Sequence, residues 1–178
     1  MRAVQSVQTK DTQDSAHFGD DESNLTVRQK AETRFWLQVL NVNKLIYGDL
    51  NSALNDRFGL SVAKFDVLAQ LFRYPDGVSM GELSKNLKVS NGNVSGLVTR
   101  LRKDGLVDRQ VTETDRRSFR ASLTEKGRKV FDEANKLHRQ VVSTKLQSVP
   151  MSDIDAVTSG LKAMSMKTKD AFEEEEEI

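Results

Sequence analysis

Helix start and stop signals recur at short intervals between residues 59 and 123, and they limit the folds that this segment can adopt. Each of three short helices begins at a serine cap, at Ser61, Ser79 and Ser90. The second cap is a capping box that Glu82 completes, and Gly105 stops the third helix. We therefore expect three short helices in succession.

A strand pattern follows these helices. Apolar and polar residues alternate over two short runs, 107–111 and 119–123, and the polar stretch 112–118 separates them. This pattern predicts a hairpin with a charged tip. Three short helices followed by a hairpin form a winged helix-turn-helix lobe, so the expected fold class is mainly α with a small β-hairpin.

Long helical patterns flank the predicted lobe of residues 59–123. Residues 25–58 carry two adjoining apolar stripes, more than one small core needs, and residues 124–172 continue the helical pattern from a cap at Thr124. Pro150 interrupts that pattern, and the S-x-x-D sequence Ser152–Asp155 predicts the cap of a last helix. Both flanks are expected to be dimerisation helices of an obligate homodimer.

Charge is distributed unevenly along the chain, although the formal net charge is only +1. Residues 85–130 hold 12 Lys or Arg against 5 Asp or Glu. Residues 1–24 are polar with an acidic second half and are expected to form a mobile arm, whereas residues 173–178 form an acidic tail. A basic middle with acidic ends predicts a centre that binds a polyanion.

The third short helix has a face suited to such a partner. Opposite its apolar positions lie Gly92, Gly96, Thr99 and Lys103, with Asn91, Asn93, Ser95 and Arg100 beside them and Ser90 at the cap. Each glycine inside a helix costs about 1 kcal/mol relative to alanine, so two on one face suggest that DNA approaches the backbone closely. Asparagine amides can pair with base edges and serine hydroxyls with phosphates. A poorly optimised surface helix is the alternative.

The hairpin tip Asp115-Arg116-Arg117 is the second candidate contact. An arginine here could enter a narrow minor groove, with Asp115 pairing a neighbouring arginine to fix the tip. The plainer interpretation is a solvated turn. The helix and the tip together are more specific than either alone.

Several classes of protein are excluded or disfavoured. The chain has no cysteine, and its two histidines, His17 and His138, are too far apart for a metal site, so we expect no cofactor. Asn91-Gly92-Asn93 lacks the lysine of a phosphate-binding loop, and no paired carboxylates or nucleophilic triad indicate an enzyme. No membrane span or secretory signal is visible, which leaves the cytoplasm as the expected compartment.

The motifs of residues 60–128 resemble those of the MarR family of bacterial transcription regulators. The segments that carry the resemblance are Leu60-Ser-Val-Ala-Lys-Phe-Asp-Val-Leu, Glu82-Leu-Ser, Asn93-Val-Ser-Gly-Leu-Val-Thr-Arg-Leu, Asp104-Gly-Leu-Val, Asp115-Arg-Arg and Leu123-Thr-Glu-Lys-Gly. The resemblance implies a homodimer on pseudo-palindromic double-stranded DNA, usually a repressor that a small ligand releases. It also implies that Ser90–Arg100 is the recognition helix and Thr112–Ser118 the wing. The chain lacks the cysteine that oxidant-sensing members use.

The resemblance further implies a small-molecule effector, often an aromatic carboxylate or its coenzyme A thioester, bound between the dimerisation helices and the DNA-binding lobe. Core packing is the alternative for the aromatic candidates, helix-dipole pairing for the arginine, and a core or interface position for the histidine. The candidate lining residues are Phe35, Trp36, Asn43, Tyr47, Phe65, Phe72, Arg73 and His138.

Two other functions are consistent with the same patterns. A winged helix can mediate protein contacts, with the basic stretch as a solvated surface, and a DNA-binding protein can act constitutively without a ligand.

Overall fold

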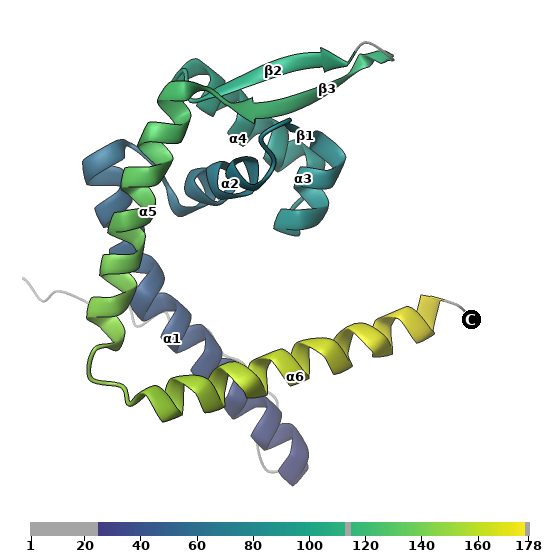
Figure 1. Ribbon diagram of the computed structural model, residues 1–178. Coiled ribbons are helices and arrows are strands. Elements are labelled where there is room, and N and C mark those ends of the chain that lie inside the picture. The colour runs from purple at the N-terminus through teal and green to yellow at the C-terminus, as the bar shows by residue number, and fades with distance from the viewer. Residues whose placement is uncertain (1–24, 113–114, 177–178) are drawn as a thin grey trace, which may run out of the picture. The chain divides into compact units, whose positions relative to one another are not determined.

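The computed structural model describes the backbone of residues 25–112 and 115–176 and the side chains of residues 25–109 and 119–168. The expected arm, residues 1–24, therefore lies outside the described residues. The chain divides into two compact units, Met1–Leu40 and Asn41–Ile178. In chain order the elements are α1 (Val27–Phe58), α2 (Val62–Arg73), β1 (Val78–Ser79), α3 (Met80–Leu87), α4 (Asn91–Lys103), β2 (Val107–Thr112), β3 (Asp115–Leu123), α5 (Glu125–Leu146) and α6 (Met151–Glu176) (Figure 1).

The predicted fold class is confirmed, and the helices of the lobe begin where the sequence indicates. Ser61, Ser90 and Thr124 each accept a hydrogen bond from the backbone N–H three residues later. Ser79 and Glu82 form the complete reciprocal capping box. These bonds satisfy N–H groups that the first turn of a helix would otherwise leave without a partner.

The predicted cap of the last helix is wrong. α6 begins at Met151, one residue before Ser152, and the carbonyl of Pro150 accepts the N–H groups of Asp153 and Ile154. The Ser152 hydroxyl lies 3.3 Å from the Asp153 carboxylate instead of capping the helix. Proline suits this start because its φ is already fixed near the helical value and it has no N–H to satisfy.

The sheet contains one strand more than the predicted hairpin. β2 and β3 pair as expected, but β1 adds to the other edge of β3, giving the order β1-β3-β2. Val78 pairs with Ala121 and Ser79 with Arg120. The Arg120 guanidinium also donates to the Gly77 carbonyl at 2.7 and 3.2 Å, which ties the turn before β1 to the middle of β3.

α2 supplies the largest share of the core, and α3, α4, α5 and the sheet contribute to the same cluster. Gly127, in the first turn of α5, packs directly on the chain before β2: a Cβ there would lie 2.0 Å from the Leu106 carbonyl oxygen. The α5 start therefore has a fixed position on the lobe. Side chains that are almost completely buried are Leu54, Leu60, Val67, Leu68, Leu71, Val78, Leu83, Val94 and Leu101.

The flanking helices expose many apolar side chains. Only Leu50 and Leu54 of the two apolar stripes on α1 are buried, and large apolar side chains of α6 such as Val157 and Leu161 are exposed. α6 runs on to Glu176, so most of the acidic run 173–177 continues the helix. Within the described residues, no helix combines the length and hydropathy needed to cross a membrane.

Candidate nucleic-acid interface and cavity

α4 turns one apolar side into the core and leaves the opposite side free. Val94, Val98 and Leu101 are buried, while Leu97 is half-buried. The exposed Gly92 and the half-buried Gly96 lie on this opposite side. The residues of α4 and its cap that are predicted to contact DNA are all exposed there: Ser90, Asn91, Asn93, Ser95, Thr99, Arg100 and Lys103. The helical period thus brings the predicted contact residues of α4 together on one accessible surface.

Hydrogen bonds within the protein determine which donors and acceptors of α4 are free to bind a partner. The Thr99 hydroxyl donates to the Ser95 carbonyl at 2.8 Å, so only its oxygen lone pairs and its methyl group are available to a partner. The Ser90 oxygen accepts the Asn93 N–H at 3.4 Å, which leaves its hydroxyl proton free to donate. No hydrogen bond to another described residue holds the side-chain amides of Asn91 and Asn93.

The two glycines of α4 are not required by the protein's own packing. Nothing lies within 4 Å of a Cβ placed at Gly92, and at Gly96 the nearest atoms belong to the Arg100 guanidinium, 3.7 Å away. Alanine would fit both positions and favour the helix. Their presence is therefore consistent with a partner that approaches the α4 backbone from outside.

Cations surround this surface. Arg100, Arg102 and Lys103 are exposed, and none of them forms an ion pair with a carboxylate of the described residues. The Arg109 guanidinium on β2 stacks 3.4 Å from the ring centroid of Phe119 on β3. Stacking pre-orders this exposed arginine for a phosphate. Arg102 and Arg109 are not among the contact residues predicted from the sequence; the diagonal pairing of Arg109 with Phe119 follows only once the strand register is known.

The hairpin tip is shorter than predicted. Strand pairing continues beyond Val111, through a register shift, to Thr112 and Asp115, so Asp115, Arg116 and Arg117 belong to β3 instead of the turn. The irregularity lets the strands pair beyond the alternating pattern, which is why the pattern placed the strand end too early. The side chains of these three residues lie outside the described residues, and their predicted DNA contacts stay predictions.

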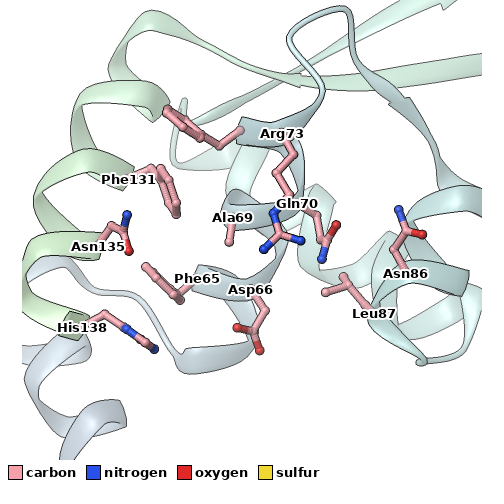
Figure 2. Close-up of a pocket in the computed structure, with 11 residues that line it drawn as sticks. Phe65, Asp66, Ala69, Gln70, Arg73, Asn86, Leu87, Phe131, Asn135 and His138 are labelled. Atoms are coloured by element: carbon pink, nitrogen blue, oxygen red, sulfur yellow. The ribbon is translucent and has the colours of Figure 1, made fainter. Parts of the chain in front are cut away.

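A cavity of about 640 Å³ lies among α2, α3 and α5, within the size range of small-molecule sites (Figure 2). An aromatic ladder forms one wall: centroid distances are 4.8 Å for Phe72 and Phe131, 5.5 Å for Phe131 and Phe65, and 5.0 Å for Phe65 and His138. The complete lining is Phe65, Asp66, Ala69, Gln70, Phe72, Arg73, Asn86, Leu87, Phe131, Asn135 and His138.

The cavity also carries charge. Burial raises the pKa of the Asp66 carboxyl above its ordinary value of 3.8, while the charge of His138 acts in the opposite direction. Figure 2 shows the Arg73 side chain reaching from the end of α2 back along the helix toward Gln70. No group of three or more His, Asp or Glu in the described part of the chain has the arrangement of a metal site.

Four of the eight predicted ligand residues line this cavity: Phe65, Phe72, Arg73 and His138. Asn43 and Tyr47 are exposed on α1 and do not line it, and neither do Phe35 and Trp36, which belong to the unit Met1–Leu40. The polar lining residues Asp66, Gln70, Asn86 and Asn135 were not predicted from the sequence. For Asp66 and Gln70 a signal existed, because both share a helical face with Arg73.

Comparisons with known proteins find similarity to transcription regulators. A family model described as MarR family matches residues 58–118. The transcriptional activatory protein BadR of Rhodopseudomonas palustris is 38% identical over 76 residues, 42% of this chain and 43% of BadR, so the match spans less than half of that relative.

Solved structures match more of the chain. A MarR family transcriptional regulator from Silicibacter pomeroyi is 43% identical, with a TM-score of 0.71 over 81% of this chain and 99% of that one. CouR from Rhodococcus jostii RHA1, solved bound to p-coumaroyl-CoA, is 24% identical, with a TM-score of 0.65 over 73% of this chain and 90% of CouR. The likeness to CouR is one of fold.

Proposed function

Because the chain belongs to the MarR family of DNA-binding transcription regulators, we propose that it binds an inverted-repeat operator as a homodimer and represses transcription until a small aromatic acid or its coenzyme A thioester releases it. The relatives found are regulators, and this chain is a regulator and not an enzyme. An operator on the chromosome would place the protein in the cytoplasm.

The exposed side of α4 carries the DNA-binding part of the proposal. It combines amides without partners, two glycines that the fold does not need, and cations without carboxylate partners in the described structure. α4 would lie in the major groove with Asn91 and Asn93 near base edges, while Arg109 and the wing would contact the backbone and the minor groove.

The cavity supports the effector part. Its aromatic wall suits a planar ring, and Arg73 supplies positive charge for an acid. CouR was solved with an aromatic acyl-CoA, which makes this class the first to test. An effector can act only if it binds the DNA-competent and DNA-incompetent forms with different affinities.

The operator can be found by selection from random duplexes, followed by fluorescence anisotropy titrations at several salt concentrations. We expect an inverted repeat with half-sites about 10 base pairs apart. The logarithm of the binding constant should fall linearly with the logarithm of the salt concentration. Arg116→Ala and Arg117→Ala should weaken binding without lowering the melting temperature. Arg139→Ala, which removes an exposed arginine from α5, is the matched control.

Each part of the proposal has its own contradicting outcome. If both wing variants bind as tightly as the parent at physiological salt, the wing contacts are wrong. If the selection from random duplexes yields no preferred sequence, a winged helix that mediates protein contacts becomes the favoured function. A bound effector that leaves the operator dissociation constant unchanged would favour a constitutive regulator. A reporter gene behind the selected operator distinguishes repression from activation, the role that BadR's name assigns to that relative.

A further inference from the structure

The Arg100 side chain lies back along α4 toward Gly96, one helical turn nearer the start of the helix. Both terminal guanidinium nitrogens, Nη1 and Nη2, lie 3.7 Å from the point where a Cβ at Gly96 would be, and Cζ lies 4.0 Å from that point. The two nitrogens are thus closer to Gly96 than the carbon that joins them. The Nη1–Nη2 edge of the guanidinium therefore faces the N-terminal half of α4, the direction that long side chains favour in a helix.

The missing side chain of Gly96 leaves room for this arrangement. A methyl group there would be in van der Waals contact with the guanidinium, and a longer side chain would compete with it for the same space. Arg100 is exposed and forms no ion pair with a carboxylate of the described residues. Its charge is therefore available to a partner that binds this part of α4.

The position of the guanidinium along α4 determines which part of DNA it meets. The N-terminal residues of a recognition helix contact base edges, whereas its C-terminal end lies nearer the DNA backbone. Arg100 is the tenth of the 13 residues of α4, so its place in the sequence alone indicates a phosphate contact. Because the side chain reaches back, the guanidinium lies beside Gly96, the sixth residue, where the helix would contact base edges.

The donors of Arg100 also have no rival beside them that matches the same base edge. Gly92 and Gly96 have no side chain, and the Thr99 hydroxyl already donates to the Ser95 carbonyl. A guanidinium presents two N–H donors side by side. In the major groove only guanine presents two acceptors, O6 and N7, whereas adenine, cytosine and thymine each present at most one.

We propose that Arg100 donates to O6 and N7 of one guanine in each half-site of the operator, and that Gly96 provides the space from which it does so. This inference rests on the DNA-binding part of the proposed function. It makes Arg100 a residue that determines sequence specificity. A phosphate contact would instead raise the affinity for every sequence alike.

Selection from random duplexes with the parent and two variants tests which base Arg100 contacts. The parent should prefer guanine about tenfold or more over any other base at one position of each half-site. Arg100→Ala should reduce this preference to less than about threefold and keep the preferences at the other positions. Arg100→Gln should replace guanine by adenine at the same position, because a glutamine amide matches N6 and N7 of adenine.

Arg102→Ala and Arg102→Gln are the matched controls. Arg102 is another exposed arginine of α4 without an ion pair in the described structure, but its side chain leaves the helix about 200° away from that of Arg100. Both control variants should keep the base preferences of the parent, even where their overall affinity falls.

The base analogue 7-deazaguanine, in which a carbon replaces N7, tests the contact at a single atom of the DNA. At the selected position of one half-site it should weaken binding of the parent about tenfold, the effect of one lost hydrogen bond to a charged group. Arg100→Ala should bind the two duplexes equally. Anisotropy titrations measure these dissociation constants, and thermal melts confirm that each variant is folded.

The proposal is overturned if the parent prefers no guanine in the half-site, or if Arg100→Ala weakens all sequences equally and keeps the preference for guanine. It is also overturned if the parent binds equally well when 7-deazaguanine replaces each preferred guanine in turn. Any of these results beside a selected inverted repeat rejects only the Arg100 contact. A parent that selects no sequence at all rejects the DNA-binding part of the proposed function as well.

Discussion

Gly92 and Gly96 are two positions of α4 where helix stability and the proposed function require opposite residues. The fold leaves space for a methyl group at both, and alanine is the better helix former. Gly81 is a natural comparison, because it is the second residue of α3 as Gly92 is the second residue of α4, and nothing lies within 4 Å of its Cβ position either.

Gly92→Ala and Gly96→Ala should each raise the free energy of unfolding by up to about 1 kcal/mol and yet weaken operator binding, because a methyl group keeps the backbone away from the DNA. Urea denaturation and anisotropy titrations measure the two effects. Gly81→Ala should stabilise the protein similarly and leave the operator affinity unchanged. Unchanged affinity in both α4 variants would mean that α4 is simply a poorly optimised surface helix.

Titration of Asp66 makes the stability of the fold depend on pH. Because burial raises its pKa above 3.8, the folded protein binds this proton more tightly than the unfolded chain does. The contribution of Asp66 to stability is therefore fully present below pH 3.8 and is lost as the pH rises through the raised pKa. Because Asp66 is exposed, solvent screens this effect and keeps it small.

Asp66→Asn should accordingly raise the stability measured by denaturant unfolding at pH 7, and the gain should shrink as the pH is lowered toward 3.8. Asp132→Asn, which removes the same charge from an exposed position of α5, serves as the control. If Asp66→Asn raises the stability equally at all pH values, the gain comes from a difference in packing between aspartate and asparagine and not from titration.

At the scale of elements, local signals could be read from the sequence and long-range ones could not. The caps at Ser61, Ser79 and Ser90 were predictable because each involves residues three positions apart. β1 was not, because its two residues form a strand only by pairing with Ala121 and Arg120, more than 40 positions away. Nothing within residues 78–79 indicates that pairing.

In the candidate site, too, the residues set by local signals were predicted and those set by long-range contacts were not. The exposed side of α4 follows from the helical period alone, so its residues were predicted. The stack of Arg109 on Phe119 depends on the register of β2 and β3, and it was missed. In the cavity, Asn86 comes from α3 and Asn135 from α5, and only the packing of these helices against α2 brings them together.

For the whole molecule, the exposed apolar side chains raise the question of association. Trp36 is 57% exposed, Leu45 59%, Val157 61% and Met166 59%. Monomeric proteins rarely leave so many large apolar groups in water unless a partner covers them. These side chains lie on α1 and α6, which flank the lobe in the sequence and are the proposed dimerisation helices.

We predict that the protein has twice the 20.0 kDa mass of the chain when light scattering is measured from nanomolar to micromolar concentration. Trp36→Glu and Val157→Glu should each shift the mass toward the monomer, because a buried charge without a partner is costly in an interface. Asn55→Glu adds the same charge at an exposed polar position of α1 and should leave the mass unchanged.

The same variants connect assembly to operator binding. When one subunit of a dimer binds a half-site, the second subunit binds the other half-site at a high effective concentration. A monomeric variant should therefore lose far more affinity for the full inverted repeat than for a single half-site. Anisotropy titrations on the two duplexes measure this ratio. A parent protein that is monomeric at micromolar concentration, or a monomeric variant that binds the full repeat as tightly as the parent, would contradict recognition of the operator by a dimer.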